Sequence, residues 1–423
     1  MTQPSTLSDE MVRQLVAVGQ VDILVGLPTL DNAATVAGVV KAVHVAFSKQ
    51  FTRDRTVMIH SDGGSTDGTP EIVRDASIID AETLTASHGL RTTHRISTPY
   101  HGIPGKAGAL RTFFAAADLL QAKAVAVIEP NVTNPTPEWV AALVRPAFRE
   151  QIDYVVPLHP RHRFDAPLVS QIIRPLIRGA YGCQVRQAAG GEFGCSGRFA
   201  AHCLEQDVWE DKFSEFGLDL WLATHAMASG YRLGQAWLGP RAVAESATLP
   251  GLVELFRQVV GSLFTCLELH ERYWMARQGS EPLPTFGEEQ APRGPEAEVA
   301  IEPLVTAFRK GMDDLQPIME RILTPETHAA LRETAAGDRL RVSNRLWART
   351  VFDFAAAHRL AVMHRDHLLQ AMVPIYLGRV ASFVENCGAC DAAAVDTQID
   401  ALGLEFEQAR DYLIERWNPL RVR

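Results

Sequence analysis

Two different hydrophobic patterns divide the chain. In residues 1–250, short apolar runs alternate with amphipathic segments, which predicts a mostly parallel β-sheet covered by helices. The expected strands are Ile23–Leu27, Thr56–His60, Val125–Ile128 and Tyr154–Leu158, with a further strand at Tyr231–Gln235. The expected helices are Ala34–Phe47, Glu71–Ala76, Gly105–Leu120 and Pro137–Glu150, the first of them capped near Asp31 or Asn32.

From residue 251 onward the pattern is almost wholly helical. Apolar positions recur at spacings of three and four in residues 252–277 and again in residues 344–385. Between them, residues 278–297 are rich in Pro, Gly and Glu, which is typical of a flexible linker. We therefore expect an α/β domain over residues 1–250 and a helical domain over residues 251–423 that contains this linker.

Composition and charge narrow the class of protein. With 423 residues and a net charge of −9, the chain is typical of a globular enzyme, and it has no basic block suited to nucleic acid or to an anionic membrane. The N-terminus lacks a basic-then-apolar signal sequence, so we expect a cytoplasmic protein. Six scattered cysteines fit reduced thiols, and the single CxxC at Cys387 and Cys390 has no second pair for a zinc site.

The segment SDGGSTDGT, residues 61–69, carries the first chemical signal. It follows an expected strand and combines Asp62 with Gly64 and several hydroxyl side chains. An Asp at a strand end can bind a ribose or a base edge, and the amides at the start of the next helix can face anionic groups. A stretch of this composition is also an ordinary turn. The buried strand Ile23–Leu27 and the helix expected after it lie upstream of this segment, and this context favours a sugar-nucleotide pocket.

Six segments in order complete a larger pattern between residues 20 and 245. They are LPTLDN, SDGGSTDGT, GIPGKAGALRTFFAAA, AVAVIEPNVTNPTPEWV, RQAAGGEFGCSGR and FGLDLWLATHAMASGYRL. Together they resemble the GT-A glycosyltransferases of the family 2 type, most closely the retaining glucosylglycerate, mannosylglycerate and glucosyl-3-phosphoglycerate synthases. The YLGRVASF segment of the helical tail also resembles the glucosylglycerate synthases. The resemblance implies a Rossmann-like GT-A domain followed by an α-helical C-terminal domain.

The resemblance also implies roles for residues within these motifs. The residues implied to bind the sugar nucleotide are Pro28, Thr29, Asp31, Asp62, Gly64, Gly105, Lys106 and Glu129. Those implied on the acceptor side are Gly190, Gly191, Glu192 and Asp219, and the implied catalytic set is Asp219, Glu192 and Lys106. Alternatives stay open: Lys106 as a solvated lysine at a helix start, Asp219 as a capping residue before a helix, and the pair Glu210 and Asp211 in the role of Asp219.

The chain departs from the resembled family at the metal site. The family's Asp-x-Asp is replaced by Glu129-Pro130-Asn131, and Val243 stands where a histidine ligand is expected. Glu129 could still bind Mg²⁺ or Mn²⁺, with Asn131 offering a carbonyl oxygen. Three interpretations remain. The metal site is weakened, or cations such as Lys106, Arg161 and Arg163 replace the metal, or the protein is a catalytically dead relative that still binds nucleotide.

The expected reaction follows from the resemblance. It is the transfer of glucose or mannose from a UDP- or GDP-sugar to a small hydroxy acid such as glycerate, with retention. The arginine that phosphate-using relatives place before an RPL pattern is absent around Ala166 and Pro167, which favours an unphosphorylated acceptor. Arg174, Arg178 and Arg186 are possible partners for its carboxylate or for surface acids. The competing class is a binding protein that retains the fold as a nucleotide sensor or scaffold. The helical tail predicts a homodimer.

Overall fold

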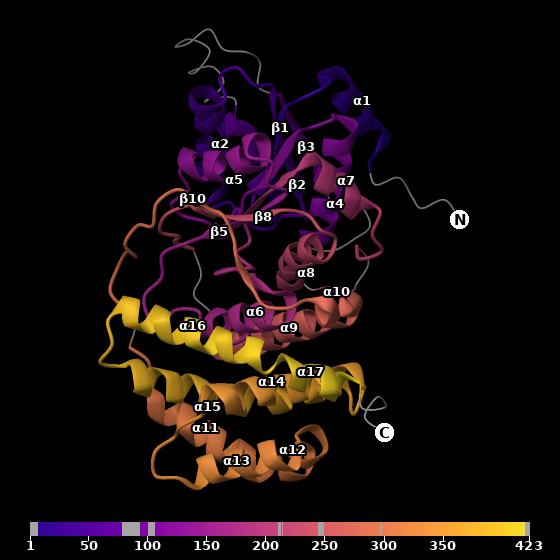
Figure 1. Ribbon diagram of the computed structural model, residues 1–423. Coiled ribbons are helices and arrows are strands. Elements are labelled where there is room, and N and C mark those ends of the chain that lie inside the picture. Colours follow the sequence, from indigo (N-terminus) through magenta and orange to yellow (C-terminus); the bar gives the residue numbers. More distant parts are fainter. Residues whose placement is uncertain are drawn as a thin grey trace. The chain divides into compact units, whose positions relative to one another are not determined.

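The computed structural model describes residues 7–77, 94–99, 106–209, 213, 215–243, 249–296 and 298–418. The chain forms two compact units, each built from more than one segment of the sequence (Figure 1). Unit 1 comprises Met1–Pro160, Ala189–Ser246 and Pro284–Ala291, and unit 2 comprises Arg161–Ala188, Ala247–Leu283 and Pro292–Arg423. The chain therefore passes between the units at several points besides the one near residue 250.

Unit 1 is built on an eight-stranded sheet in the order β10-β8-β5-β7-β4-β1-β2-β3. The strands are β1 Ile23–Thr29, β2 Thr56–Asp62, β3 His94–Pro99, β4 Ala124–Val127, β5 Tyr154–Leu158, β7 Phe193–Ser196, β8 Leu233–Trp237 and β10 Thr285–Phe286. All neighbouring pairs are parallel except those of β7, which runs antiparallel to β4 and β5. The predicted α/β class with a mostly parallel sheet is confirmed.

Helices cover both faces of this sheet (Figure 1). They are α1 Asp9–Val18, α2 Val36–Gln50, a helix over residues 69–77, α4 Lys106–Leu119, α5 Pro137–Arg149, α7 Gly197–Leu204 and α8 Glu215–Ala228. On one face, α2 and α5 pack on alternate residues of β1, namely Ile23, Val25 and Leu27, in a core that includes Trp139. On the other face, α4 packs against α7 and contributes the buried Phe113.

The start of α2 differs from the expected one. Thr35 occupies the N-cap position, so the predicted cap at Asp31 or Asn32 is wrong. Those two residues lie in a preceding turn, where Asp31 has a positive φ of 51° and the Asn32 carbonyl accepts hydrogen bonds from the amides of Thr35 and Val36. Asp and Asn favour such turns as readily as helix caps, and both residues form hydrogen bonds in the loop described below.

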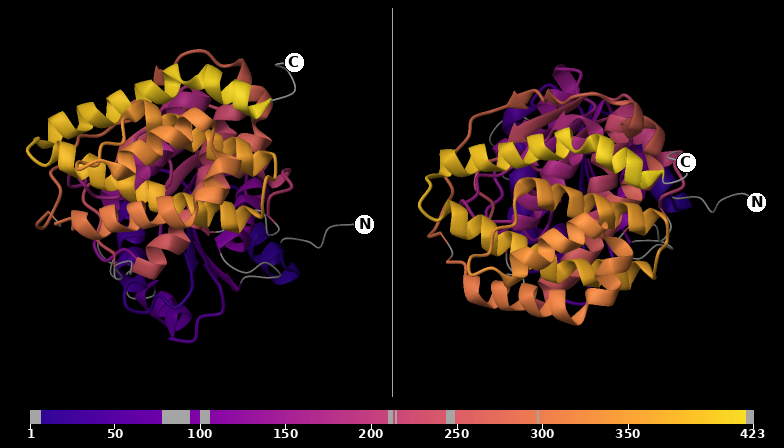
Figure 2. Two further views of the ribbon diagram at one scale, coloured as in Figure 1. Left: turned by 90° about the horizontal axis from the view of Figure 1, so that it is seen from below. Right: turned by 60° about the horizontal axis from the view of Figure 1, so that its bottom comes forward.

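Unit 2 is predominantly helical, as predicted for the C-terminal part of the chain. Its elements are η1 Val169–Ile173, α6 Arg174–Tyr181, β6 Cys183–Gln184, α9 Leu249–Leu269, α10 Glu271–Ala276, β9 Glu281–Pro282, α11 Ile301–Asp314, α12 Gln316–Ile322, α13 Pro325–Ala336, α14 Asn344–Arg359, α15 Arg365–Cys387, α16 Ala392–Gln408 and α17 Arg410–Trp417. Figure 2 shows α14, α15 and α16, coloured orange to yellow, lying side by side. None of the helices described in either unit is both long and apolar enough to cross a membrane.

The expected linker is only partly irregular. Within residues 278–297, β9 pairs with β6 in unit 2, and β10 pairs with β8 at the edge of the main sheet of unit 1. Residues 281–286 therefore contain two short strands where the composition predicted a loop. Strand pairing depends on a distant partner, and a local excess of Pro, Gly and Glu does not report it.

A buried arginine organises part of unit 2. Arg379, in the YLGRVASF segment, donates to Gln171 Oε1 at 2.9 Å, to the Val342 carbonyl at 2.6 Å and to Asn344 Oδ1 at 2.8 Å. Burial lowers the pKa of its guanidinium to about 10. The indole N–H of Trp347 donates to the Gln171 carbonyl at 2.6 Å. This segment thus joins η1 to the helices of unit 2, and its arginine has a structural role.

In unit 1, Asp153 joins three strands near their ends. Its buried carboxylate accepts two hydrogen bonds of 2.6 Å from Arg198, one of 2.8 Å from Ser196 Oγ and one of 3.0 Å from the Arg232 amide. Burial alone would raise the pKa of Asp153, but these donors lower it below its usual value. The carboxylate therefore contributes stability above its unfolded pKa, and this contribution is lost as the pH falls through the lower pKa of the folded state.

We predict that Asp153→Asn destabilises the protein at pH 7 by about 1–3 kcal/mol, because the amide has one acceptor oxygen for four donors. The difference from the wild type should shrink below about pH 4, where the wild-type carboxylate becomes protonated. Thermal unfolding from pH 3 to pH 7 measures both effects, and Glu150→Gln, at an exposed residue, is the control. A constant difference across this range would contradict the prediction.

Candidate functional site

The candidate site lies at one edge of the sheet of unit 1. The parallel strands β1, β2, β4, β5 and β8 all end there, and the antiparallel β7 begins there. After β1 the chain continues to β2 on one side of the sheet, and after β4 it continues to β5 on the other side. The connections that follow the neighbouring strands β1 and β4 therefore lead in opposite directions. In open α/β sheets, ligands bind at such a switch point, outside the carboxyl ends of the strands. Thr35 Oγ1 donates to the Pro130 carbonyl at 2.5 Å and links the two diverging loops.

Asp62 organises the loop after β2. Its Oδ1 accepts hydrogen bonds from Thr29 Oγ1 at 2.8 Å and Ser65 Oγ at 2.5 Å, and its Oδ2 accepts from the amides of Gly64 at 2.9 Å and Ser65 at 2.8 Å. Although burial alone would raise the pKa of Asp62, these donors lower it. Four donors use the four lone-pair directions of a carboxylate. In this arrangement Asp62 shapes the loop rather than presenting a free oxygen to a ligand.

The loops after β1 and β2 are joined along their length. The Asp31 amide donates to Ser65 Oγ at 2.9 Å, and Asp31 Oδ1 accepts from the Thr66 amide at 2.8 Å. One residue further on, the Asn32 amide donates to Thr69 Oγ1 at 2.8 Å. Pro28 and Thr29 lie within β1 itself, opposite Ser61 and Asp62 of β2. The residues expected to hold the nucleotide, Pro28, Thr29, Asp31, Asp62 and Gly64, are therefore neighbours, and Gly105 lies outside the described residues.

Lys106, the first residue of α4, is the centre of a second group. Its Nζ lies 2.5 Å from Glu129 Oε1, 2.9 Å from the Gly191 carbonyl, and 3.0 and 3.3 Å from the two oxygens of Asp219. The Lys106 side chain is 10% exposed, and those of Glu129 and Asp219 are 18% and 6% exposed. The structure thus unites four residues from four motifs, which we name the Lys106 cluster, and Lys106 is not the solvated lysine of the alternative interpretation.

Asp219 lies inside a helix and not before one. Helix α8 begins at Glu215, four residues earlier, so the interpretation of Asp219 as a capping residue is wrong. Its carboxylate also accepts a hydrogen bond of 3.0 Å from the Gly191 amide. The helical run FGLDLWLATHAMA is apolar on nearly all sides, which is why the position of the helix start was hard to predict. Asp219 is buried and contacts both Lys106 and Gly191, so it belongs to the Lys106 cluster.

One lysine faces two carboxylates in this cluster. Burial alone would lower the pKa of Lys106, but Asp219 and Glu129 raise it above its usual value, so the ammonium is charged. For Asp219, burial is the largest influence and, with the charge of Glu129, it outweighs Lys106 and raises the pKa to about 6. With both carboxylates ionised, the three side chains carry a net charge of −1, and protonation of Asp219 removes it.

Gly191 is required by the close packing of this cluster. Its φ is +89°, and a Cβ built on it would lie 2.4 Å from Glu129 Cγ. Its carbonyl and its amide contact Lys106 and Asp219, respectively. Gly190 precedes it in the same loop and packs against Pro157 of β5. The glycine pair thus lets the backbone contact the buried side chains of the protein itself, and its expected role toward an acceptor stays a prediction.

Glu192 forms a neighbouring ion pair at the start of β7. Its Oε1 accepts a hydrogen bond of 3.0 Å from Arg241 Nε, and its Oε2 lies 3.7 Å from His159 Nε2, an electrostatic contact longer than a hydrogen bond. Burial alone would raise the pKa of Glu192, but His159 and Arg241 lower it, so the carboxylate is ionised. His159 Nδ1 lies 2.8 Å from the Gly239 carbonyl. We did not predict a role for Arg241, which follows the end of β8 as His159 follows the end of β5.

The structure places the two residues expected to hold a metal ion, Glu129 and Asn131, in different surroundings. Glu129 faces the Lys106 ammonium, which would repel a cation, and Asn131 is exposed. Val243 pairs with Val132 in an isolated antiparallel bridge, so the position where a histidine was expected does lie beside the Glu129-Pro130-Asn131 segment. Within the described residues, no three His, Cys, Asp or Glu side chains are placed to hold a metal ion.

Several arginines that the sequence suggested as ligands form ion pairs inside unit 2. Arg163 is paired with Glu296 at 2.6 Å. The three arginines considered as acceptor ligands bind acidic residues of α16: Arg174 binds Asp396 and Asp400, Arg178 binds Glu407, and Arg186 binds Asp396. The alternative of surface ion pairs is thus the one observed for them. Glu210 and Asp211 lie outside the described residues.

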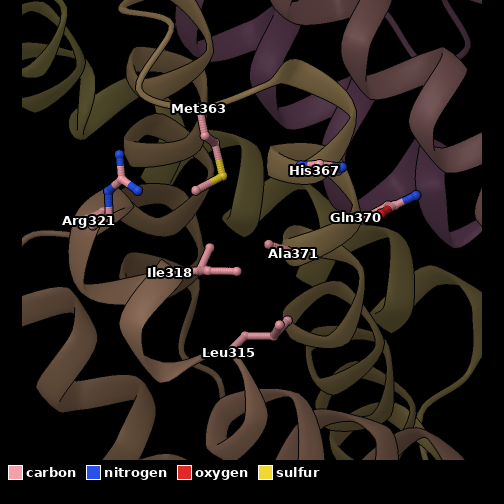
Figure 3. Close-up of a pocket in the computed structure, with 7 residues that line it drawn as sticks. All are labelled: Leu315, Ile318, Arg321, Met363, His367, Gln370 and Ala371. Carbon is pink, nitrogen blue, oxygen red and sulfur yellow. The ribbon is translucent and has the colours of Figure 1, made fainter.

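Unit 2 contains a pocket of its own, with a volume of about 410 Å³ (Figure 3). Residues of α12 and α15 and of the segments that precede them line it, and they are Leu315, Ile318, Arg321, Met363, His367, Gln370 and Ala371. None of the residues predicted for the site is among them. The pocket has no carboxylate in its lining and does not resemble the Lys106 cluster in its chemistry.

Comparison with known proteins yields matches among solved structures. No protein family and no curated protein sequence matches the chain. Glucosyl-3-phosphoglycerate synthase from Mycobacterium tuberculosis matches in its complex with Mn²⁺, UDP and glucosyl-3-phosphoglycerate, with 21% identity, coverage of 63% of this chain and 86% of that chain, and a TM-score of 0.43. Its complex with phosphoglyceric acid matches with 22% identity, the same coverage and a TM-score of 0.44. This synthase is one of the group that the sequence resembles, and a likeness this distant assigns neither activity nor substrate.

We predict that Gly191→Ala destabilises the protein more than Gly64→Ala. Both glycines have positive φ, +89° and +99°, but a Cβ at Gly64 has no atom within 4 Å. The backbone strain of about 1–2 kcal/mol is common to both variants, and the contact with Glu129 adds about 1–3 kcal/mol in Gly191→Ala alone. Urea unfolding of the two variants measures the difference. Equal losses of stability would contradict the packing described for Gly191.

We also predict a pH-dependent effect of Asp219→Asn. The wild-type carboxyl has a pKa of about 6 when folded and about 3.8 when unfolded, so the folded state binds more protons between these values. Wild-type stability relative to the variant should therefore be highest below pH 4 and fall by about 2 kcal/mol as the pH rises from 4 to 6. Unfolding of both proteins at pH 4, 5, 6 and 7 measures this. Parallel pH curves would show that Asp219 titrates normally.

Proposed function

We propose that the protein is a glycosyltransferase that binds a nucleoside diphosphate sugar at the switch point of unit 1 and transfers the hexosyl group to a small hydroxy acid. The observation that carries this proposal is the Lys106 cluster, a buried polar group beside the joined loops of β1 and β2. It lies at the edge where α/β sheets bind ligands, and its residues come from the motifs on which the resemblance rests.

The donor would lie across the ends of β1 and β4. The loops held by Asp62 and Asp31 would receive the nucleoside, and the positive charge of Lys106 would receive the diphosphate. Lysine is suited to phosphate as a point charge on a flexible stem. We propose UDP or GDP as the nucleotide and glucose or mannose as the sugar, following the resemblance.

The acceptor would approach from the side of Gly191, Glu192 and Asp219. In a transfer with retention, the bond from the anomeric carbon to the phosphate oxygen breaks while the bond to the acceptor oxygen forms. The acceptor proton passes to the leaving phosphate, so Asp219 would orient the acceptor rather than remove its proton. We propose glycerate or a similar hydroxy acid as the acceptor. The homodimer and the cytoplasmic location stay predictions.

A second candidate is a binding protein without transferase activity. The observation that favours it is the pairing of Lys106 with two carboxylates and a carbonyl, which uses all three of its N–H donors. Together with Asn131 and Val243 in place of metal ligands, this arrangement would suit a nucleotide sensor. An active enzyme must let Lys106 exchange a partner for the diphosphate.

Calorimetric titration with UDP-glucose and GDP-glucose tests donor binding. We predict that one of them binds and that Lys106→Met weakens this binding at least about tenfold, since one charge-assisted contact to phosphate is lost. Lys123→Met is the matched control, because Lys123 is a 65% exposed lysine of the same unit, paired with Asp22. Circular dichroism verifies the folding of both variants.

Incubation of the bound donor with D-glycerate or 3-phosphoglycerate tests transfer, and NMR of the anomeric proton reports retention. Donor binding without a product would favour the second candidate. No binding of either sugar nucleotide would contradict the proposal as a whole.

A further inference from the structure

The oxygen atoms around Lys106 have the arrangement of a cation site. Four of them, from Glu129, Gly191 and Asp219, lie 2.5 to 3.3 Å from Nζ. They come from separate parts of unit 1: the end of β4, the loop before β7, and α8. Carboxylate and carbonyl oxygens are also the ligands that hard divalent cations take, at about 2.0–2.6 Å. We name this set of oxygens the oxygen cage.

Contacts that do not involve the lysine hold the oxygen cage in place. The Gly191 amide donates to Asp219 Oδ2 at 3.0 Å, which fixes the carbonyl and the carboxylate relative to each other. The Gly191 backbone also packs directly against the Glu129 side chain. The cage can therefore keep its shape when its occupant changes.

We propose that Lys106 is a built-in cation that takes the place of a divalent metal ion in this site, so that the sugar nucleotide is bound without metal. This inference rests on the proposed function for its diphosphate ligand. A metal ion could enter the cage only by displacing a buried ammonium from two carboxylates. Among the described residues, the positions that adjoin it, Asn131 and Val243, offer no further anionic ligand for such an ion.

An ammonium group can supply the charge that the reaction needs. The departing phosphate requires positive charge close to its oxygens, and either a lysine or a metal ion provides it. The two contacts of Lys106 to Asp219 are its longest, at 3.0 and 3.3 Å, whereas the contact to Glu129 is 2.5 Å. Rotation of the lysine stem can exchange Asp219 for a phosphate oxygen and keep Glu129. This step exchanges hydrogen bonds and breaks no covalent bond.

The wild-type protein gives the first test. We expect no tight Mn²⁺ binding, measured as the loss of the free-ion signal in electron paramagnetic resonance. We also expect equal affinity for the preferred sugar nucleotide, within about twofold, in EDTA and in Mn²⁺. One tightly bound Mn²⁺ per chain, or nucleotide binding that requires Mn²⁺, would overturn the proposal.

Two variants of Lys106 give the second test. Lys106→Ala vacates the oxygen cage and should bind one Mn²⁺, whereas Lys106→Met fills the same volume without charge and should bind none. Added Mn²⁺ should restore nucleotide binding to Lys106→Ala, which loses at least tenfold in EDTA, and should raise its melting temperature. Adding Glu129→Gln to Lys106→Ala should abolish Mn²⁺ binding. Equal Mn²⁺ affinity of the Ala and Met variants would overturn the assignment of the cage.

These measurements separate the two proposals. If neither sugar nucleotide binds the wild type under any condition, the proposed function fails, and the Mn²⁺ titrations of the three proteins still decide the nature of the cage. If Lys106→Ala does not fold, the wild-type measurements alone decide whether the native site requires metal.

Discussion

The contact on which the site depends is the burial of one ammonium group between two carboxylates. Taking ions out of water costs several kcal/mol per ion, and a buried pair repays this only when its geometry is good and its remaining donors are satisfied. Lys106 meets this condition, because Glu129, Asp219 and the Gly191 carbonyl accept from it. The same contacts hold α4, the end of β4, the loop before β7 and α8 in one arrangement.

The antiparallel strand β7 makes this arrangement possible. The last residues of each parallel strand lie at the edge where ligands bind. Because β7 runs in the opposite direction, the residues that precede it lie at that edge. Gly191 and Glu192 thus lie beside the end of β4. The positive φ of Gly191 then turns its carbonyl toward Lys106 while its amide contacts Asp219. The segment Gly190-Gly191-Glu192 therefore supplies the backbone contacts to Lys106 and Asp219 and one further carboxylate.

The sequence predicted the strands of the sheet better than the contacts among the candidate site residues. Alternation of apolar runs predicted β1, β2, β4 and β5 because each is buried, and the ends of parallel strands must meet at one edge. It did not predict β3, nor β7 and β10, which have four and two residues and depend on distant partners. The start of α8 was missed because its sequence is too apolar to show a boundary. The pairing of Lys106 with Glu129 and Asp219 joins residues up to 113 positions apart, and no local pattern encodes it.

The net charge of the Lys106 cluster affects which charge the proposed acceptor can carry. A divalent ion would neutralise two carboxylates, whereas a single ammonium leaves one negative charge when both are ionised. Glu192 adds a carboxylate that Arg241 already neutralises. Each further negative charge on an acceptor therefore meets repulsion in a buried setting, where screening is weak. The arginines considered as acceptor ligands, Arg174, Arg178 and Arg186, form ion pairs with acids of α16 within unit 2. For the proposed transferase, this balance supports the expectation of an acceptor with a single carboxylate, as does the absence of an arginine around Ala166 and Pro167.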